Sequence, residues 1–370
     1  MNRAWIEINL KALEHNIKSI KNMIPEQCMI MAVVKANAYG HGDIQIAEYL
    51  NQMGIDTFAV ATLDEGIRLR KSGIKGYILI LGYTHIEYFN DIVYHNLIQT
   101  VVDADYAKQL NTFGEKVMVH IKIDTGMHRL GLDFRDMNVI KGLLEFENLD
   151  IRGIYSHLCV SDSLSDTDIS FTNQQIRCFC KVREFLNEHG YHNIKTHLQS
   201  SYGILNYQEI DCNYVRPGII LYGIQSSMNI KTKVSLDLKA VLSIKARIAS
   251  IHEIDAGESV GYERKFRAVN KRTVATVTIG YADGIPRSLT GQKTIVKGKF
   301  AKIIGNICMD QLMIDITNIK SVKQGDIVTL IGQEKGLTVS AEEMAYHDNT
   351  ITNELLSRLG TRLEKVYCND

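Results

Sequence analysis

The sequence predicts an α/β fold with an N-terminal (β/α)8 barrel of the TIM type and a C-terminal, mostly antiparallel β domain. Over about the first 220 residues, strand-like apolar runs alternate with helix-like stretches, as in a closed parallel barrel. After about Val234, strand-like runs follow one another with short connections. At 370 residues the chain is long enough for two cores. We therefore expect domains at 11–233 and 234–370.

The chain opens with a strand-like segment, residues 4–10, in which apolar and polar residues alternate. We expect this strand to join the second domain because it precedes the barrel pattern, although periodicity alone leaves its partner open. The barrel strands are expected at 29–34, 57–62, 77–81, 97–102, 117–124, 151–157, 194–200 and 215–222. Helical spacing is found at 13–24, 43–53, 64–71 and 171–189.

The second domain is expected to contain one helical stretch, Ser340–Leu359, among its strands. Its strand-like runs are 237–254, 272–280, 294–296, 301–310, 312–317 and 326–331.

Composition narrows the class of protein. The 42 Lys and Arg residues balance the 42 Asp and Glu residues, so no net field attracts nucleic acid or anionic lipid. The longest apolar runs are shorter than the roughly 20 residues that a membrane helix needs. The seven cysteines are scattered, without zinc spacing, which indicates reduced thiols and a cytoplasmic location. We expect no metal.

The octapeptide Lys35–Gly42, Lys-Ala-Asn-Ala-Tyr-Gly-His-Gly, follows the buried strand-like run 29–34. A lysine at the carboxyl end of a barrel strand lies where such barrels keep their chemistry. Burial disfavours the charged amine, which can then attack a carbonyl and form a Schiff base. Glycines and alanines beside it leave room for a flat ligand. A lone lysine in this position would more often extend its amine to the solvent.

The whole octapeptide resembles the pyridoxal-phosphate site of the alanine racemase family. The resemblance extends from Trp5 to Tyr367, with several separate motifs in the family's order. It implies that Lys35 binds the cofactor covalently and that Tyr39 contacts its phosphate.

The resemblance places two further groups around the cofactor. Arg216, in Tyr-Val-Arg-Pro-Gly-Ile, would face the pyridine nitrogen and keep it unprotonated, because arginine does not give up its proton. The ring is then a weaker electron sink, which favours racemisation over transamination and decarboxylation. The phosphate would be held by Ser201, Gly218, Ile219 and Tyr39. Without the resemblance, Arg216 would more often be a surface ion pair.

Tyr281, in Ile-Gly-Tyr-Ala-Asp-Gly, is implied to be the second acid/base group beside Lys35. A free phenol has a pKa of about 10, so a base at neutral pH needs neighbours that lower this value. His157 would supply this link by joining Tyr281 to Arg216. The structural alternative for His157 is a core histidine whose hydrogen bonds are made within the protein. The alternative for Tyr281 is an aromatic residue in a turn before Asp-Gly.

The substrate carboxylate would meet Arg129, because a guanidinium holds a carboxylate by paired hydrogen bonds. Lys122, seven residues earlier, occupies the place of the family's carbamylated lysine and is a candidate for that modification. The segment with Met309 and Asp310 matches the family's other carboxylate-contacting motif. In the family, Tyr281, Met309 and Asp310 reach the other subunit's barrel, so a homodimer with composite sites is implied.

Asn353 stands where typical alanine racemases have a tyrosine that lines the substrate pocket. An amide with more space beside it can meet a hydroxyl, which serine has and alanine lacks. The replacement resembles the racemase domain of the membrane-bound serine racemases of vancomycin resistance, which supply D-serine for peptidoglycan precursors. We therefore expect interconversion of L- and D-serine with alanine also accepted. A turn cap is the structural alternative for Asn353.

Other functions remain open at this point. The main alternative is a biosynthetic alanine racemase that makes D-alanine for the cell wall. A non-enzymatic pyridoxal-phosphate carrier would lack the second domain, and a barrel decarboxylase would place a carboxylate where Arg216 stands. The resistance proteins carry a transmembrane domain before the racemase domain. We expect this chain to be either the cytoplasmic domain of such an anchored protein or a free-standing cytoplasmic racemase.

Overall fold

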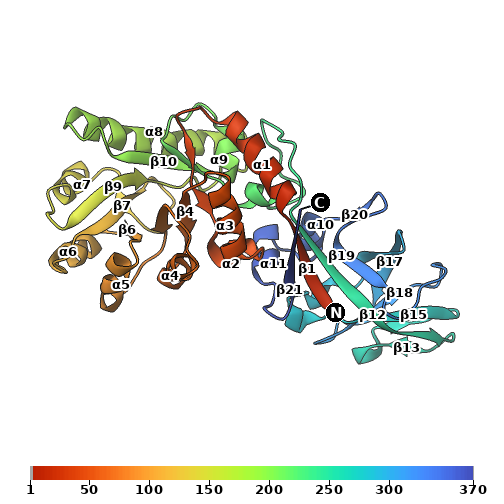
Figure 1. Ribbon diagram of the computed structural model, residues 1–370. Helices are drawn as coiled ribbons and strands as arrows, with labels where there is room; N and C mark the ends of the chain where they lie inside the picture. The colour runs from red at the N-terminus through yellow and green to blue at the C-terminus, as the bar shows by residue number, and fades with distance from the viewer. Residues whose placement is uncertain (1–2, 370) are drawn as a thin grey trace.

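The computed structural model describes residues 3–369, which form two lobes side by side (Figure 1). The first lobe is a nearly closed parallel barrel, and the second is built on a mostly antiparallel sheet. The predicted fold class is therefore confirmed. Asp370, the last residue of the predicted second domain, lies outside the described residues.

The barrel closes through one interrupted strand. Its hydrogen-bonded path begins at β2 and ends at β3, which are successive parts of the same run. Met31, between them, donates to Val215 on one side, and Val34 donates to Ala59 on the other. The strands in path order are β2 (Met29–Ile30), β11 (Tyr214–Arg216), β10 (Lys195–Ser200), β9 (Leu149–Tyr155), β7 (Val117–Asp124), β6 (Ile98–Val101), β5 (Tyr77–Ile80), β4 (Thr57–Val60) and β3 (Ala32–Val33), and β8 (Leu132–Asp133) pairs with β7.

Helices cover the outside of the barrel, and their starts follow from the sequence. Asn9 caps α1 by accepting from Ala12 N, and Thr62 and Glu65 form a capping box on α4. Leu13, Ile17 and Ile20 bury the inner face of α1. The helices are α1 (Leu10–Met23), α2 (Lys35–Tyr39), α3 (Asp43–Gln52), α4 (Leu63–Lys71), α5 (Phe89–Tyr94), α6 (Ala104–Thr112), α7 (Met137–Leu143), α8 (Asp166–Glu188) and α9 (Ser201–Asn206).

The second domain contains the first and last described strands. β1 (Ala4–Asn9) pairs antiparallel with β12 and parallel with β21, so the chain's first strand belongs to its second sheet. The domain limits 11–233 and 234–370 stay a proposal. The other elements are β12 (Leu242–Ile254), β13 (Ser259–Val260), β14 (Phe266–Arg267), β15 (Arg272–Val277), β16 (Lys293–Val296), β17 (Lys299–Ile304), β18 (Leu312–Asp315), β19 (Ile327–Glu334), β20 (Leu337–Val339), α10 (Ala341–His347), α11 (Thr352–Ser357) and β21 (Glu364–Cys368).

Three element predictions differ clearly from the structure. The strand expected at 301–310 ends at Ile304, where Gly305 has a φ of 67°. The strand expected at 215–222 ends at Arg216, because Pro217 has no N–H for the ladder, and a 3-10 helix, η2 (Ile219–Tyr222), follows. The single helix expected at 340–359 is two helices, α10 and α11. Asn349 between them has a φ of 55°, a left-handed conformation that ends α10.

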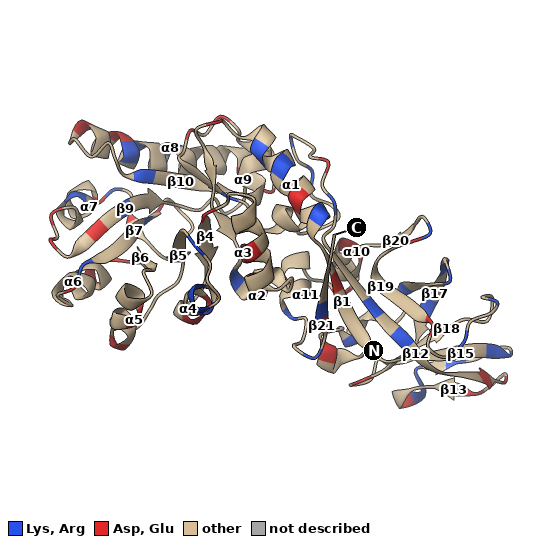
Figure 2. Ribbon diagram, in the orientation of Figure 1, with Lys and Arg blue, Asp and Glu red and all other residues tan. Residues whose placement is uncertain are grey.

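Charged residues of both signs are spread over both lobes (Figure 2). No helix among residues 3–369 combines the length and the apolar character needed to cross a bilayer. All seven cysteines are free thiols. In the same described range, no group of three or more His, Cys, Asp or Glu side chains is arranged to hold a metal ion.

Candidate cofactor and substrate site

A pocket of about 550 Å³ opens at the carboxyl ends of the barrel strands. This volume is typical of small-molecule sites. Residues from both domains line it. The predicted site residues that it brings together are Lys35, Tyr39, Lys122, Arg129, His157, Ser201, Arg216, Gly218, Ile219 and Asn353.

Lys35 enters the pocket from an unusual turn. The four residues after it, 36–39, all have φ values between 52° and 55°, so this turn of α2 is left-handed. Such backbone costs about 1–2 kcal/mol per residue for L-amino acids and is typical of functional sites. Glu65 stabilises the turn because its carboxylate accepts from Ala36 N and Ala61 N, both at 2.7 Å.

The end of this turn packs tightly against the second domain. Gly40 has a φ of 83°, and a Cβ on it would lie 2.3 Å from the carbonyl oxygen of Leu356 in α11. Only glycine satisfies both the backbone conformation and this approach. The contact fixes the lysine turn relative to α11, which carries Asn353.

The environment of Lys35 favours a neutral amine. Burial lowers the pKa of Lys35, and the positive charge of Arg129 lowers it further. A neutral amine is the nucleophilic form that attacks an aldehyde.

Arg216 is 3% exposed and held by four acceptors. Nη2 donates to the carbonyl oxygens of Ser156 (2.7 Å) and Leu198 (3.1 Å), and Nη1 donates to His197 Nδ1 (2.7 Å). Nη2 also lies 3.3 Å from His157 Nδ1. An arginine can only donate, so His157 accepts at Nδ1 and carries its hydrogen on Nε2. Burial first, and then Arg216, keep the pKa of His157 well below its ordinary value.

The residues predicted to hold a phosphate meet at the start of η2. Gly218 N donates to Ser201 Oγ (3.0 Å), which leaves the Ser201 hydroxyl hydrogen free for another acceptor. Ile219 opens η2, so its N–H has no partner inside that helix. Burial raises the pKa of Tyr39 to about 12, so its hydroxyl stays a donor. Gly218 is the member of this set whose N–H is already used within the protein.

The space beside Gly218 tests whether the cofactor fits. A Cβ on Gly218 would lie 2.7 Å from the Tyr39 hydroxyl, so only a bare backbone leaves this cradle open. Hydroxyl and backbone donors suit a phosphate, and Lys35 lines the same pocket. The residues present therefore fit pyridoxal phosphate.

Lys122 lines the pocket, and it shares the Tyr155 ring with a second cation, Arg216. Its Nζ is 4.7 Å from the centre of the Tyr155 ring, and Arg216 Cζ is 5.2 Å from the same ring. Burial, followed by the charges of Arg216 and Arg129, lowers the pKa of Lys122 to about 7. Much of this amine is therefore neutral at neutral pH, the form that reacts with carbon dioxide.

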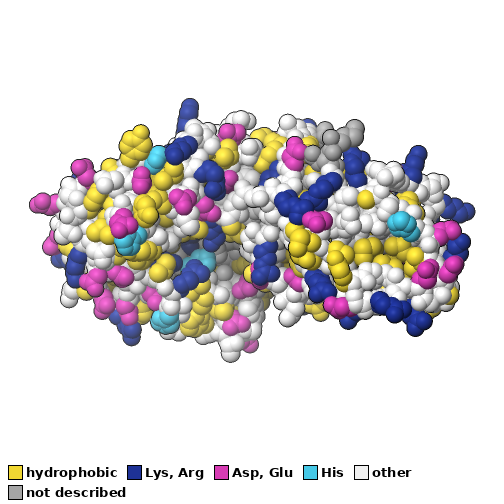
Figure 3. Space-filling model, turned by 90° about the horizontal axis from the view of Figure 1, so that it is seen from below, with side chains coloured by type: hydrophobic (Ala, Val, Ile, Leu, Met, Phe, Trp, Pro, Cys, Tyr) yellow, Lys and Arg dark blue, Asp and Glu magenta, His cyan; other side chains and the backbone are white. Residues whose placement is uncertain are grey.

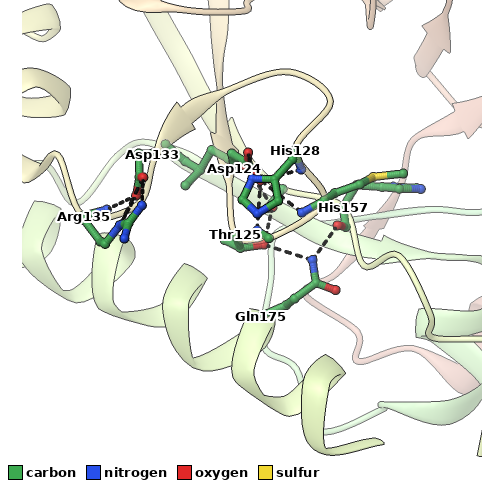
Figure 4. Close-up of polar contacts among 11 residues, drawn as sticks. Asp124, Thr125, His128, Asp133, Arg135, His157 and Gln175 are labelled. Atoms are coloured by element: carbon green, nitrogen blue, oxygen red, sulfur yellow. Dashed lines mark hydrogen bonds and ion pairs between the residues drawn. The ribbon is translucent and has the colours of Figure 1, made fainter. Parts of the chain in front are cut away.

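Arg129 reaches the pocket from the loop after β7, which Asp124 organises (Figure 4). Asp124 Oδ1 accepts from the backbone N–H groups of 126–128 at 2.9–3.1 Å. Gln175 of α8 donates to Thr125 Oγ1 (3.4 Å) and anchors the other side of the loop. Within residues 3–369 no hydrogen bond or ion pair involves the Arg129 side chain. Its guanidinium is therefore available for a carboxylate.

Asn353 lies on α11 and forms part of the pocket wall beside Ile351. Thr352 fastens this end of α11 to the barrel, since its N and Oγ1 both donate to Ser226 O (2.9 and 3.2 Å). The Asn353 Oδ1 is enclosed, and no hydrogen bond among the described residues reaches it. A buried acceptor without a donor is costly, so a ligand hydroxyl would stabilise it.

Tyr281, Met309 and Asp310 are not in this pocket. They lie together on the second domain, since Tyr281 N donates to Cys308 O (3.0 Å) and Ala282 N donates to Met309 O (2.9 Å). Tyr281 is 45% exposed and Met309 is 53% exposed, and both line shallow surface hollows. Within a single chain, the predicted site residues therefore lie in two separate places, the pocket and the surface that carries Tyr281, Met309 and Asp310.

Sequence reasoning missed three residues that organise the pocket. Glu65 holds the lysine turn, Tyr155 lies under Lys122, and His197 holds Arg216. The Thr62–Glu65 capping box predicts where α4 begins, but not that Glu65 also accepts from Ala36. No local pattern signals the other two contacts, which exist only because the barrel closes.

Comparisons with known proteins agree with this geometry. Family models described as the N-terminal and C-terminal domains of alanine racemase match residues 8–226 and 241–367. An amino-acid racemase of Enterococcus faecalis is 43% identical and a serine/alanine racemase of Enterococcus gallinarum 39% identical, each over 98% of this chain and 51% of the relative. The chain thus spans about half the length of these relatives. An alanine racemase of Clostridium perfringens is 39% identical over 98% of this chain and 95% of its own.

Solved structures show the same likeness. The alanine racemase of Clostridium difficile 630 has a TM-score of 0.93 at 35% identity, covering 100% of this chain and 97% of its own. The alanine racemase of Bacillus anthracis with bound L-Ala-P has a TM-score of 0.92 at 31% identity, covering 100% and 96%.

Proposed function

Since the chain belongs to the alanine racemase family, whose enzymes depend on pyridoxal phosphate, we propose that it interconverts L- and D-serine and also accepts alanine. The observation that carries the serine preference is the enclosed, unpaired Oδ1 of Asn353 in the pocket that also contains Lys35 and Arg129. In this proposal the product D-serine serves peptidoglycan precursors in vancomycin resistance.

Pyridoxal phosphate, once bound, withdraws electrons from the α-carbon of an amino acid and makes its hydrogen acidic. Lys35 would hold the cofactor, Ser201, Ile219 and Tyr39 would bind its phosphate, and Arg216 would face its ring nitrogen. Gly218 N–H already donates to Ser201 and would orient that hydroxyl.

Lys35 and Tyr281 are proposed to move protons on opposite faces of the substrate α-carbon. The neutral amine of Lys35 accepts or returns the proton on one face. His157 accepts from Arg216 at Nδ1 and so carries its hydrogen on Nε2, and His157 lines the pocket. This donor would stabilise a deprotonated Tyr281 hydroxyl on the other face, so the cation's effect would reach the phenol through His157.

The substrate carboxylate would bind Arg129 and the Met309 N–H, with Asp310 beside them. Arg362 pairs with Asp310 (2.7 Å) and would hold that carboxylate in place. A carbamate on Lys122 would turn a cation into an anion and position Arg129.

We propose that Tyr281, Met309 and Asp310 act in the pocket of a second copy, in a homodimer. The exposure of Tyr281 and Met309 supports this arrangement, because the two side chains come from segments that lie together and contiguous exposed apolar surface marks interfaces. On the face seen from below, hydrophobic side chains form a band along the second domain (Figure 3).

Asn353→Tyr tests the substrate proposal. We expect the serine-to-alanine ratio of kcat/KM to fall by about 2- to 10-fold, because one neutral hydrogen bond is worth about 0.5–1.5 kcal/mol. Chiral chromatography of both amino acids after reaction measures this ratio. Asn353→Leu is the matched control, since it keeps similar volume but removes the amide, and it should lower the ratio in the same direction. An unchanged ratio in both variants would favour a biosynthetic alanine racemase.

Arg216→Glu should lower racemisation and raise transamination. A carboxylate would stabilise the protonated form of the ring nitrogen and so strengthen the electron sink, and the negative charge at the α-carbon would then persist long enough for other reactions. Formation of pyruvate or hydroxypyruvate measures the side reaction, and circular dichroism checks folding. Arg216→Lys keeps the positive charge and should not gain transamination. Normal racemisation without keto acid in Arg216→Glu would disprove this role.

Lys122 is expected to carry a carbamate in air-equilibrated buffer. The neutral amine implied by its lowered pKa of about 7 can bind carbon dioxide, and the resulting anion would gain from Arg129 and Arg216 nearby. Trapping the carbamate as an ester, followed by peptide mass mapping, detects it. Lys181, an exposed lysine on α8, is the internal control. An unmodified Lys122 peptide under trapping conditions that label a known carbamate would refute the assignment.

A further inference from the structure

The barrel holds a second cavity, at the end opposite the cofactor pocket. It measures about 380 Å³. Its lining includes the first residues of five strands, namely Thr57, Tyr77, Ile98, Lys195 and Tyr214. In barrel enzymes this amino-terminal rim serves stability and the chemistry lies at the other rim. No step of the proposed reaction uses this cavity.

A chain of side chains joins the two cavities through the barrel interior. His120, on β7, lines the second cavity and is 3% exposed. Its Nδ1 lies 2.8 Å from His197 Nε2, and His197 Nδ1 lies 2.7 Å from Arg216 Nη1. Arg216 lines the cofactor pocket. Two consecutive contacts among three side chains thus cross the barrel.

The hydrogen bonds from Arg216 through His197 to His120 are all donated in the same direction. Arg216 can only donate, so His197 accepts at Nδ1 and carries its hydrogen on Nε2. That hydrogen is donated to His120 Nδ1, which leaves the hydrogen of a neutral His120 on Nε2. Burial lowers the pKa of His120 to about 3 and also lowers that of His197, so both rings are neutral. No hydrogen bond of the described residues uses His120 Nε2.

The rest of the cavity favours an anion with an apolar body. Arg152 pairs with Asp150 across 2.6 Å. Lys195, an exposed residue of the lining, has no ion pair with any of residues 3–369. Burial raises the pKa of Tyr214, so its phenol stays a donor. Apolar walls complete the space, formed by Met31, Leu79, Ile98, Ile151 and Ile194. The cavity therefore offers donors and one cation around an apolar volume.

We propose that this second cavity binds a small monocarboxylate with an apolar body, which accepts from His120 Nε2–H and Lys195. Occupancy polarises the His120–His197 chain and so reaches Arg216. This site is separate from the cofactor pocket and does not depend on which amino acid is the substrate.

Benzoate is a suitable probe, titrated calorimetrically into the cofactor-loaded protein. We expect saturable binding that benzyl alcohol, which lacks the charge, does not reproduce. Lys195→Glu should weaken binding by about tenfold or more, because it removes a charge-assisted contact. Ile194→Trp fills the cavity and should abolish binding. Lys181→Glu, an exposed change on α8 outside the cavity, is the matched control and should leave affinity unchanged.

Two further measurements test where benzoate binds and whether its binding is transmitted from His120 to His197. Arg129→Ala should still bind benzoate, since Arg129 lines the other pocket. In nitrogen NMR of histidine-labelled protein, benzoate should shift the ring signals of both His120 and His197. Absence of saturable binding would overturn the proposal, as would binding that disappears in Arg129→Ala but survives in Ile194→Trp and Lys195→Glu. Binding in the cavity without a shift at His197 would overturn the coupling.

Discussion

Lys35→Ala is expected to abolish both the absorbance of a protein-bound Schiff base and racemisation. The variant loses the amine that holds the cofactor and one of the two proposed bases, and general base catalysis alone is worth about 10²–10⁴-fold. The absorbance spectrum of the purified protein and a chiral assay with serine and alanine measure the two effects. Because the side chain lies at a pocket wall, the fold should survive.

Lys18→Ala is the matched control for this change, since Lys18 is an exposed lysine on α1. It should leave the spectrum and the rate unchanged. A Lys35→Ala protein that still shows the Schiff-base band would place the cofactor on another lysine, and Lys122 in the same pocket would then be the first to test.

Tyr281→Phe is expected to lower kcat by about 10²–10⁴-fold in both directions while the cofactor absorbance stays. The phenol hydroxyl is the only group removed, and the ring that fits the interface remains. Tyr262→Phe is the control, because Tyr262 lines the same surface hollows without a proposed role in proton transfer. Equal rates for Tyr281→Phe and the unchanged protein would rule out the two-base scheme.

Mixing the two inactive variants tests the composite site. In a symmetric dimer, a Lys35→Ala chain paired with a Tyr281→Phe chain contains one complete site, formed by the intact Lys35 of one and the intact Tyr281 of the other. Random exchange of subunits should therefore restore about one quarter of the original activity. Sedimentation of the mixture confirms dimers. Activity that stays at the level of the separate variants would refute sharing across the subunits.

The barrel could be predicted because short strand-like runs, several of them mainly apolar such as β4 and β5, alternate with stretches of helical spacing. Burial on both faces requires such runs, so their order is visible in the sequence. The errors lie where backbone chemistry overrides the pattern: Pro217 ends β11 inside an apolar stretch, and Asn349 divides the last helical stretch. A pattern of apolar residues predicts which segments are buried. It does not predict where a missing N–H group or a left-handed residue ends a strand or a helix.

The sequence alone determined which residues would stand at the carboxyl rim. Parallel strands of a barrel end at one rim, so the strand order placed Lys35 there. The resemblance to the alanine racemase family named Arg129, His157, Ser201 and Arg216 as its companions, and all five line the same pocket. This inference needs local patterns, one topological rule and the family's motifs.

Only the tertiary structure decided the remaining features. The family resemblance implied that Asn353 lines the pocket and that Tyr281 reaches another subunit. The structure shows the packing behind this, since α11 carries Asn353 from the second domain into the pocket and Tyr281 lies outside the pocket of its own chain. It also aligned His120 with His197 and Arg216 across the barrel interior. These contacts join segments far apart in the sequence, and they form because the barrel closes and α11 packs on Gly40. No local pattern encodes that packing geometry, so the sequence named the chemical groups and the packing decided which of them meet.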